Sequence, residues 1–532
     1  MSRLSPAPDR RDPFADGLVG AGTNHQHLRT DHLTLDLGRR AARGGAIAAV
    51  SHAGTFLLTI AATAIMARLL TPQDYGLIGM VAILTSFLTM FKDLGLSTAT
   101  IQRADITNDQ VTALFWLNVL LSVALVFISV VLAPLIASFY GEPRLNAITV
   151  VTSLGFLIGG FAVQHEAILR RQMRFGPLAV IRTTSIALGY LVGIAAARNG
   201  FGYWSLVLSQ LGGITATTVA VWTTCDWRPG WPRRHAGVAP LVKFGGNLTG
   251  FSILNYFARN LDNILIGRFF GSHALGLYSK AYQLMMLPID QINEPITSVA
   301  VPALSRLDGA WGRYRHAYLR MLEKVAIATM PSIAVMMVTA DWIVQLALGP
   351  QWRETSRLFV VLGITGFFQP AANTTGWLFI TQGRTRDMLR AGILVCPITI
   401  ISIVIGLSWG PLGVAASYAV TRLAVTDPFV FWLVGRRGPV RTSDFYRTLA
   451  PSICASLVAI VAGVGVRRMG LVTSPVAGIT LVAGVMMSTT VLVLSLMPMG
   501  RCALRDIFAS ASLILRMRGD EKTTDRSTPP RG

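Results

Sequence analysis

Long apolar stretches alternate with short polar connections between about residues 45 and 497. Uncharged runs at 44–67, 110–141, 145–165, 358–383 and 469–500 reach the roughly 20 residues that a helix needs to cross a bilayer. The run 391–421 is too long for one helix, and Trp409-Gly410-Pro411 divides it into two spans joined by a tight turn. This pattern predicts an all-α polytopic membrane protein with about fourteen transmembrane helices.

The connections are short enough that no soluble domain is expected between the spans. We expect the helices at about 46–67, 76–91, 111–137, 145–165, 178–197, 203–224, 244–267, 274–301, 325–347, 356–380, 388–408, 411–434, 449–466 and 471–497. They divide into a six-helix lobe at 46–224, a linker at 225–243, a second six-helix lobe at 244–434 and two additional helices at 435–499. The polar ends, 1–45 and 500–532, are predicted to be disordered tails.

The two lobes share a short sequence pattern, which indicates a duplication. Residues 67–77 align with residues 267–277 at an offset of 200, with arginine, two bulky apolar residues, glycine and leucine at matching positions. Asn199-Gly200 and Trp409-Gly410 precede the sixth and twelfth spans at an offset of 210. Because six is an even number of spans, both lobes enter the membrane in the same orientation, and we expect a relating axis along the membrane normal. Two such lobes with a cleft between them are typical of a transporter.

Lysine and arginine are distributed unequally between alternate connections. With a cytoplasmic N-terminus, the inner loops contain 22 Lys or Arg residues, among them Lys92, Arg170 and Arg182, and the outer loops contain eight. Short loops rich in Lys and Arg stay cytoplasmic, so the asymmetry predicts a bacterial inner-membrane protein with both termini inside. The first 45 residues lack an apolar segment and are not expected to be a cleaved signal peptide.

Composition supports the membrane assignment and argues against other classes. Apolar residues make up 52 % of the chain, charged residues 14 %, and the mean hydropathy is +0.53. The net charge of +21 lies mostly among spans and short loops, where anionic lipid explains it better than nucleic acid does. Four scattered cysteines indicate neither a disulfide framework nor a metal site. A phosphate-binding Gly-Lys-Ser/Thr loop is absent from the sequence, and no cofactor is expected.

Polar residues at membrane depth mark the candidate site, since such residues usually face a watery cavity or a partner. The seventh and eighth spans hold most of them, and the twelfth span adds Arg422, with Asp427 five residues further on. Arg259 and Asp262 are spaced to pair on one helix face, either as a packing element or as part of a cavity wall. We expect the substrate cavity to include Asn255, Arg259, Asp262, Asn263, Lys280 and Arg422.

Two carboxylates in the eighth span are candidates for ion coupling or gating. Asp290 and Glu294 lie four residues apart, and two carboxylates this close in a membrane tend to share a proton. The alternative is that Glu294 lies near the cytoplasmic surface and is solvated. Pro288, Pro295 and Pro302 favour a bent, movable helix.

Two stretches of the chain resemble the polysaccharide transporter family, the lipid-linked oligosaccharide flippases of the multidrug/oligosaccharidyl-lipid/polysaccharide exporter superfamily. The first comprises 67–76 and 92–99, and the second comprises 259–267, 275–284 and Leu287-Pro288. The resemblance covers about 45–500 and is greatest to the branch that serves secreted exopolysaccharides such as colanic acid and succinoglycan.

This resemblance implies a transporter, not an enzyme, that moves undecaprenyl-diphosphate-linked repeat units across the inner membrane by alternating access. Its implied partners are the lipid-linked glycan, the bilayer, and a periplasmic polymerase with chain-length and export machinery. The alternatives are a multidrug/cation antiporter of the same superfamily, a peptidoglycan-precursor flippase, and a membrane-embedded polysaccharide polymerase or ligase.

Overall fold

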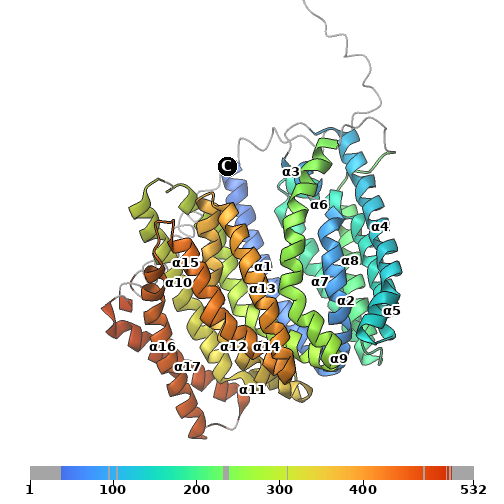
Figure 1. Cartoon of the computed structure of the whole chain (residues 1–532). Helices are drawn as coiled ribbons and strands as arrows, with labels where there is room; N and C mark the ends of the chain where they lie inside the picture. Colours follow the sequence, from blue (N-terminus) through green and yellow to red (C-terminus); the bar gives the residue numbers. More distant parts are fainter. Residues whose placement is uncertain are drawn as a thin grey trace, which may run out of the picture. The chain divides into compact units, whose positions relative to one another are not determined.

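The computed structural model describes residues 37–93, 96–102, 106–231, 239–307, 309–470, 472, 474–498, 500, 501 and 505. Within these ranges, the side chains of 37–49, 93, 99, 102, 239–255, 257–259 and 294 lie outside the description. The described residues form α-helices, with short 3-10 and π segments and no strand (Figure 1). The all-α prediction is therefore confirmed, whereas most of both predicted tails lies outside the described residues.

The chain divides into two compact units, each a bundle of long helices. The first comprises Met1–Met66 and Leu84–Leu254, and the second comprises Ala67–Ile83 and Asn255–Gly532. From α1 to α8 the helices are α1 (Leu37–Leu69), α2 (Pro72–Asp93), α3 (Leu96–Gln102), α4 (Asn108–Tyr140), α5 (Arg144–Gly160), α6 (Val163–Arg171), α7 (Phe175–Arg198) and α8 (Trp204–Thr224).

The remaining helices belong largely to the second unit. They are α9 (Ala239–Ser305), α10 (Trp311–Val338), α11 (Ala340–Ala347), α12 (Arg353–Thr381), α13 (Thr385–Gly406), α14 (Gly410–Thr421), α15 (Asp427–Gly435), α16 (Thr442–Arg468) and α17 (Pro475–Leu496). Short 3-10 turns at Pro350–Trp352 and Leu407–Trp409 and a π-helical turn at Arg422–Thr426 connect some of them.

Helices cover all the predicted spans, and ten of the described segments are long and apolar enough to cross a membrane by length and composition. The chain is therefore a multi-pass membrane protein, and the count of fourteen spans stays a prediction. The break predicted at Trp409-Gly410 is present, since Gly410 has a φ of 75° that glycine adopts without a steric cost.

The helix that holds the ninth predicted span begins several turns before that span. The sequence placed the ninth span at 325–347, but α10 begins at Trp311 and ends at Val338. The basic residues before 325 obscured this start because they suggested a loop. The helix extends further because its other face buries Tyr314, Tyr318 and Leu322 in the core of the second unit.

The seventh and eighth spans form the two limbs of α9. Gly271, with φ 78° and ψ −178°, interrupts the helix and separates limbs at 239–270 and 272–305. Tyr278 Oη donates a hydrogen bond to Asp262 Oδ2 at 2.8 Å. Asp262 lies on the first limb and Tyr278 on the second, at similar distances along the chain from Gly271. Within the second unit the limbs therefore fold back on each other as a hairpin.

The repeated sequence at 67–77 and 267–277 forms a reciprocal contact within the second unit. A methyl group at Gly76 would collide with the carbonyl oxygen of Ser272, and one at Gly276 would collide with the carbonyl oxygen of Pro72. Both contacts join positions that are equivalent at the offset of 200. The start of α2 and the start of the second limb of α9 therefore cross with their backbones touching at two glycines, as small residues permit in membranes.

The end of α1 is also held by the second unit, which explains why Ala67–Ile83 groups there and not with the predicted first lobe. The indole of Trp352 and the amide of Gln351 both donate to the carbonyl oxygen of Ala67, at 2.8 and 2.7 Å. The guanidinium of Arg68 donates to the carbonyl oxygen of Leu346 at 2.5 Å. These bonds satisfy carbonyls that a helix C-terminus leaves without a partner.

Candidate functional site

The helix of the fourth predicted span is broken near the predicted end of that span, between α5 and α6. The amide of Ala162 donates to the carbonyl of Gly159, so the carbonyl of Ile158 loses its usual helical partner. Thr218 of α8 donates to this Ile158 carbonyl at 3.0 Å. One turn further along α8, the indole of Trp222 donates to the carbonyl of Phe161 at 2.9 Å. A broken backbone at membrane depth is tolerated where other groups satisfy it or where it borders a cavity, and this break does both.

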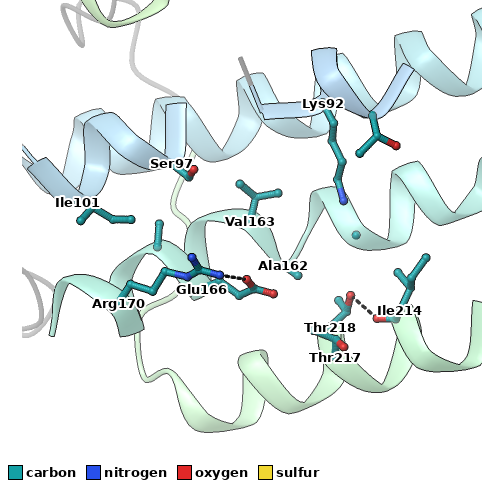
Figure 2. A pocket seen from close by; sticks show the side chains of 13 residues that line it. Lys92, Ser97, Ile101, Ala162, Val163, Glu166, Arg170, Ile214, Thr217 and Thr218 are labelled. Atoms are coloured by element: carbon teal, nitrogen blue, oxygen red, sulfur yellow. Dashed lines mark hydrogen bonds and ion pairs between the residues drawn. The ribbon is translucent and has the colours of Figure 1, made fainter. Parts of the chain in front are cut away.

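A cavity of about 370 Å³ lies beside the break, wholly within the first unit. Figure 2 shows Lys92 reaching in from α2, while α6 contributes Glu166 and Arg170 and α8 contributes Thr217 and Thr218. The described residues that line it are Thr89, Lys92, Ser97, Ile101, Gly159, Ala162, Val163, Glu166, Ala167, Arg170, Ile214, Thr217 and Thr218.

A second cavity, of about 570 Å³, shares three of these lining residues, namely Glu166, Arg170 and Thr217. It adds His52 of α1 and Arg182 of α7 to the charged and polar lining. Glu166 pairs with Arg170 at 3.5 Å, which cancels one positive charge. Among the described residues that line the two cavities, the three cations Lys92, Arg170 and Arg182 outnumber this single carboxylate by two. Hydroxyl groups surround these charges, so the site suits a polar ligand that carries negative charge.

Gly159 holds space for the ammonium group of Lys92. A methyl group on Gly159 would collide with Lys92 Nζ, while its next neighbour, Ile214, would be at an ordinary contact distance of 3.6 Å. The lysine end is flexible and can move away. A substitution here therefore displaces the charge without disturbing the helix packing.

We expect Gly159→Ala to lower transport several-fold without lowering stability. Alanine favours a helix over glycine by about 1 kcal/mol, which offsets the small cost of moving the lysine. Transport in proteoliposomes and thermal unfolding in detergent would measure the two effects. Gly54→Ala is the matched control because a methyl group there meets nothing within 4 Å. A large loss of thermal stability in Gly159→Ala would contradict the expectation.

Sequence reasoning missed this site. It assigned Lys92, Arg170 and Arg182 to cytoplasmic loops because they add to the inside-positive count. It ended the fourth span at about residue 165, so that Gln164, His165 and Glu166 marked its boundary. The available signal was Gly159-Gly160, a few residues before these polar residues, which weakens the helix shortly before polar groups follow.

The structure places several of the predicted cavity residues in the second unit. Asp262 accepts from Tyr278 and, at 2.8 Å, from the backbone amide of Asn263. Asn263 Oδ1 is buried without a hydrogen-bond partner among the described groups. Lys280 is buried, donates to Gln283 at 3.0 Å, and lies 4.1 Å from the centre of the Tyr75 ring.

The other predicted residues are only partly described. The side chains of Asn255, Arg259 and Glu294 lie outside the described residues, so the Arg259–Asp262 pairing stays a prediction. Asp290 is exposed on the second limb of α9. Within the part of the chain that the structure describes, no group of three His, Cys, Asp or Glu side chains is arranged to hold a metal ion.

Arg422 lies in the π-helical turn Arg422–Thr426 and makes several internal bonds. It pairs with Asp427 at 3.1 Å, donates to Tyr418 Oη at 3.2 Å, and also donates to Gln369. Both members of the ion pair are largely buried, with side-chain exposures of 14 % and 12 %. These bonds use the charge of Arg422 to hold α12, α14 and α15 together.

We expect Arg422→Ala to destabilise the protein by about 3–5 kcal/mol, because it leaves the Asp427 carboxylate buried without its cation. The double variant Arg422→Ala/Asp427→Ala should recover much of the lost stability, because it also removes the buried carboxylate. Thermal unfolding of the purified variants would measure both effects, with the exposed Arg437→Ala as the control. Equal stability of Arg422→Ala and the parent would refute a structural role for the pair.

Comparison with known proteins assigns a family to this fold. Residues 65–357, more than half of the chain, match the family described as "Polysaccharide biosynthesis protein". The lipopolysaccharide biosynthesis protein WzxC of Escherichia coli (strain K12) is 26 % identical over 393 residues, which cover 72 % of this chain and 78 % of WzxC. The teichuronic acid biosynthesis protein TuaB of Bacillus subtilis (strain 168) is 28 % identical over 332 residues, which cover 62 % of this chain and 68 % of TuaB.

Solved structures share the fold at low sequence identity. The inward closed conformation of the lipid II flippase MurJ has a TM-score of 0.67 at 13 % identity, covering 84 % of this chain and 98 % of MurJ. An inward-facing multidrug resistance MATE family transporter of the MOP superfamily has a TM-score of 0.58 at 16 % identity, covering 74 % of this chain and 96 % of that transporter. The family match includes the cavity beside the broken span and both glycines of the helix crossing. The chain therefore belongs to the polysaccharide biosynthesis protein family.

Proposed function

We propose that this protein is a flippase, not an enzyme, and that it moves lipid-linked oligosaccharide repeat units across the bacterial inner membrane for exopolysaccharide synthesis. The observation that carries the proposal is the cationic, hydroxyl-lined cavity beside the broken fourth span. Family membership and the fold shared with a lipid II flippase support it.

The chemistry of the cavity suits the head group of such a substrate. A glycan carried on undecaprenyl diphosphate has a negative diphosphate next to many neutral hydroxyls. Lys92 and Arg170 supply cations for the diphosphate, and arginine in particular forms paired hydrogen bonds to phosphate oxygens. Thr217 and Thr218 can exchange hydrogen bonds with sugar hydroxyls. The excess of two cations over carboxylates among the described lining residues disfavours the alternative of an organic-cation exporter, because this lining would repel positively charged substrates.

We propose that residues of the second unit act in the same transport cycle. Asn255, Arg259, Asp262, Asn263 and Lys280 remain our candidates for contacts with the substrate. Arg422 is a less favoured candidate because its guanidinium bonds to Asp427, Tyr418 and Gln369. Asp290 and Glu294 remain the candidates for ion coupling or gating. A periplasmic polymerase with chain-length and export machinery would use the translocated units.

The proposed location has both termini in the cytoplasm. In a background with Cys396, Cys454 and Cys502 replaced by alanine, Asn199→Cys should react with an impermeant maleimide in intact cells. Arg437→Cys should react only after permeabilisation. Native Cys225 should stay unlabelled in both cases, because it is 1 % exposed and burial raises the pKa of its thiol. Labelling of Arg437→Cys in intact cells would reverse the orientation.

Two measurements test the proposed function. Depletion of the protein in cells should trap undecaprenyl-linked repeat units in the cytoplasmic leaflet. In proteoliposomes, the purified protein should move a fluorescent polyprenyl-diphosphate oligosaccharide to the leaflet where an added glycosidase can cleave it. Transport of ethidium without movement of the lipid-linked glycan would favour the multidrug alternative and overturn the proposal.

A further inference from the structure

The first four turns of α10 carry a row of basic side chains that the functions above do not use. Arg313, His316, Arg320 and Lys324 are spaced three, four and four residues apart, which places them on one face of the helix. At 1.5 Å per residue, the row extends for about 16 Å. These four residues, with Gly312, Ala317 and Met321, line a hollow of about 530 Å³ on the second unit.

The orientation of this face is fixed by contacts on the other sides of the helix. Tyr314 and Tyr318 are fully buried and hydrogen-bond to Thr381 and Thr374 of α12, at 2.5 and 2.8 Å. Arg315 forms a two-pronged ion pair with Asp444 of α16, with bonds of 2.8 and 2.6 Å. The charge of Arg315 therefore has a structural role, and the row is held facing away from the core.

The row extends outward from the membrane surface. The stretch 325–338 of α10 is free of charged residues, whereas 311–324 contains four Lys or Arg residues, His316 and one acidic residue, Glu323. Lys324 therefore marks the level at which the helix leaves the hydrocarbon, and Arg313 lies about 16 Å further out along the helix. The predicted topology places this end of α10 on the cytoplasmic side.

We propose that this row, Arg313–His316–Arg320–Lys324, is a docking surface for the head group of the polyprenyl-diphosphate-linked oligosaccharide before translocation. This inference rests on the proposed function, and it adds a second substrate-binding site, which lies on the second unit. A lipid-linked glycan carries its diphosphate at the membrane surface and its sugars outward from it. Lys324 and Arg320 lie at the depth expected for the diphosphate. Arg313 lies further out, where it can pair with acidic groups on the sugars. A phospholipid head group is shorter and would reach only the inner end of the row.

Equilibrium binding tests this proposal without requiring transport. The full-length protein in detergent micelles would be titrated with polyprenyl diphosphate oligosaccharide, with polyprenyl diphosphate alone and with phosphatidylglycerol. Arg313→Gln/Arg320→Gln/Lys324→Gln should bind the oligosaccharide at least tenfold more weakly than the parent. It should lose less affinity for polyprenyl diphosphate, which lacks the sugars, and little for phosphatidylglycerol.

The control removes the same charge from exposed positions elsewhere in the second unit, as Arg306→Gln/Arg437→Gln/Arg447→Gln. It should keep the parent's affinity. Arg313→Lys/Arg320→Lys provides a second variant that keeps the charge and should retain most of the binding. Unchanged oligosaccharide binding in the triple variant overturns the proposal, as does an equal loss of phosphatidylglycerol, which would indicate a lipid anchor. Weakened binding in a protein that does not flip the glycan would support the docking surface while refuting the proposed function.

Discussion

Alanine at Gly76 or at Gly276 is expected to destabilise the protein by about 3 kcal/mol and to lower its abundance in the membrane. At each position the added methyl group would collide with a backbone carbonyl of the opposing helix, Ser272 in one case and Pro72 in the other. A backbone atom cannot rotate away as a side chain can, so the two helices must separate. Overpacking of this kind costs about 1–3 kcal/mol or more.

Thermal unfolding in detergent and the yield of monodisperse protein would measure this effect. The reciprocal geometry adds a sharper expectation. Since both substitutions disrupt one crossing, Gly76→Ala/Gly276→Ala should lose less stability than the sum of the single losses. Gly376→Ala is the matched control, because a methyl group there meets nothing within 4 Å. Parent-like stability in either single variant would show that the helices do not cross in this way.

Lys92→Ala should reduce flipping of the lipid-linked glycan by at least tenfold while leaving the protein folded. Lys92 places an ammonium group in the cavity beside the broken span, where we propose that the diphosphate of the substrate binds. One lost charge-assisted contact in a partly enclosed site costs about 1.5–3 kcal/mol, which corresponds to a factor of ten or more. Lys92→Arg keeps the charge in a larger group and should retain part of the activity.

Initial rates of flipping in proteoliposomes, normalised to folded protein, would measure this loss. Arg198→Ala is a suitable control, since Arg198 is an exposed cation of the same unit outside both cavities. A full flipping rate in Lys92→Ala would remove the cavity from the proposed substrate path. Loss of folded protein in Lys92→Ala would instead assign the lysine a structural role.

The sequence was sufficient for the helical architecture because membrane spans are governed by a strong local rule. Apolar runs of the required length must be helical, and Gly410 marks a break that only its positive φ permits. The repeat at an offset of 200 also corresponds to a physical contact between Gly76 and Gly276. These features are local or repeated, so they are visible without knowledge of the tertiary structure.

The site was harder to predict because its residues come together only through tertiary contacts. Lys92 and Arg170 resemble loop charges in the sequence, and they line a cavity only because α5 and α6 separate at Phe161 and α8 packs beside the break. The extension of α10 before residue 325 was not predicted, for a related reason. Its basic face suggested a loop, and the burial of Tyr314 and Tyr318 against α12 depends on a partner distant in sequence.

The reciprocal glycine crossing also restricts how the two repeats can diverge in evolution. In most packed interfaces a larger residue on one side can be accommodated by a smaller residue on the other. Here both positions already hold the smallest residue, and the colliding atoms are backbone carbonyls that every amino acid possesses. A larger residue at Gly76 therefore cannot be compensated by a smaller residue at Gly276, and the reverse is equally impossible. The two similar sequences can diverge at other positions, but these two glycines must be retained together for as long as the helices meet at this spacing.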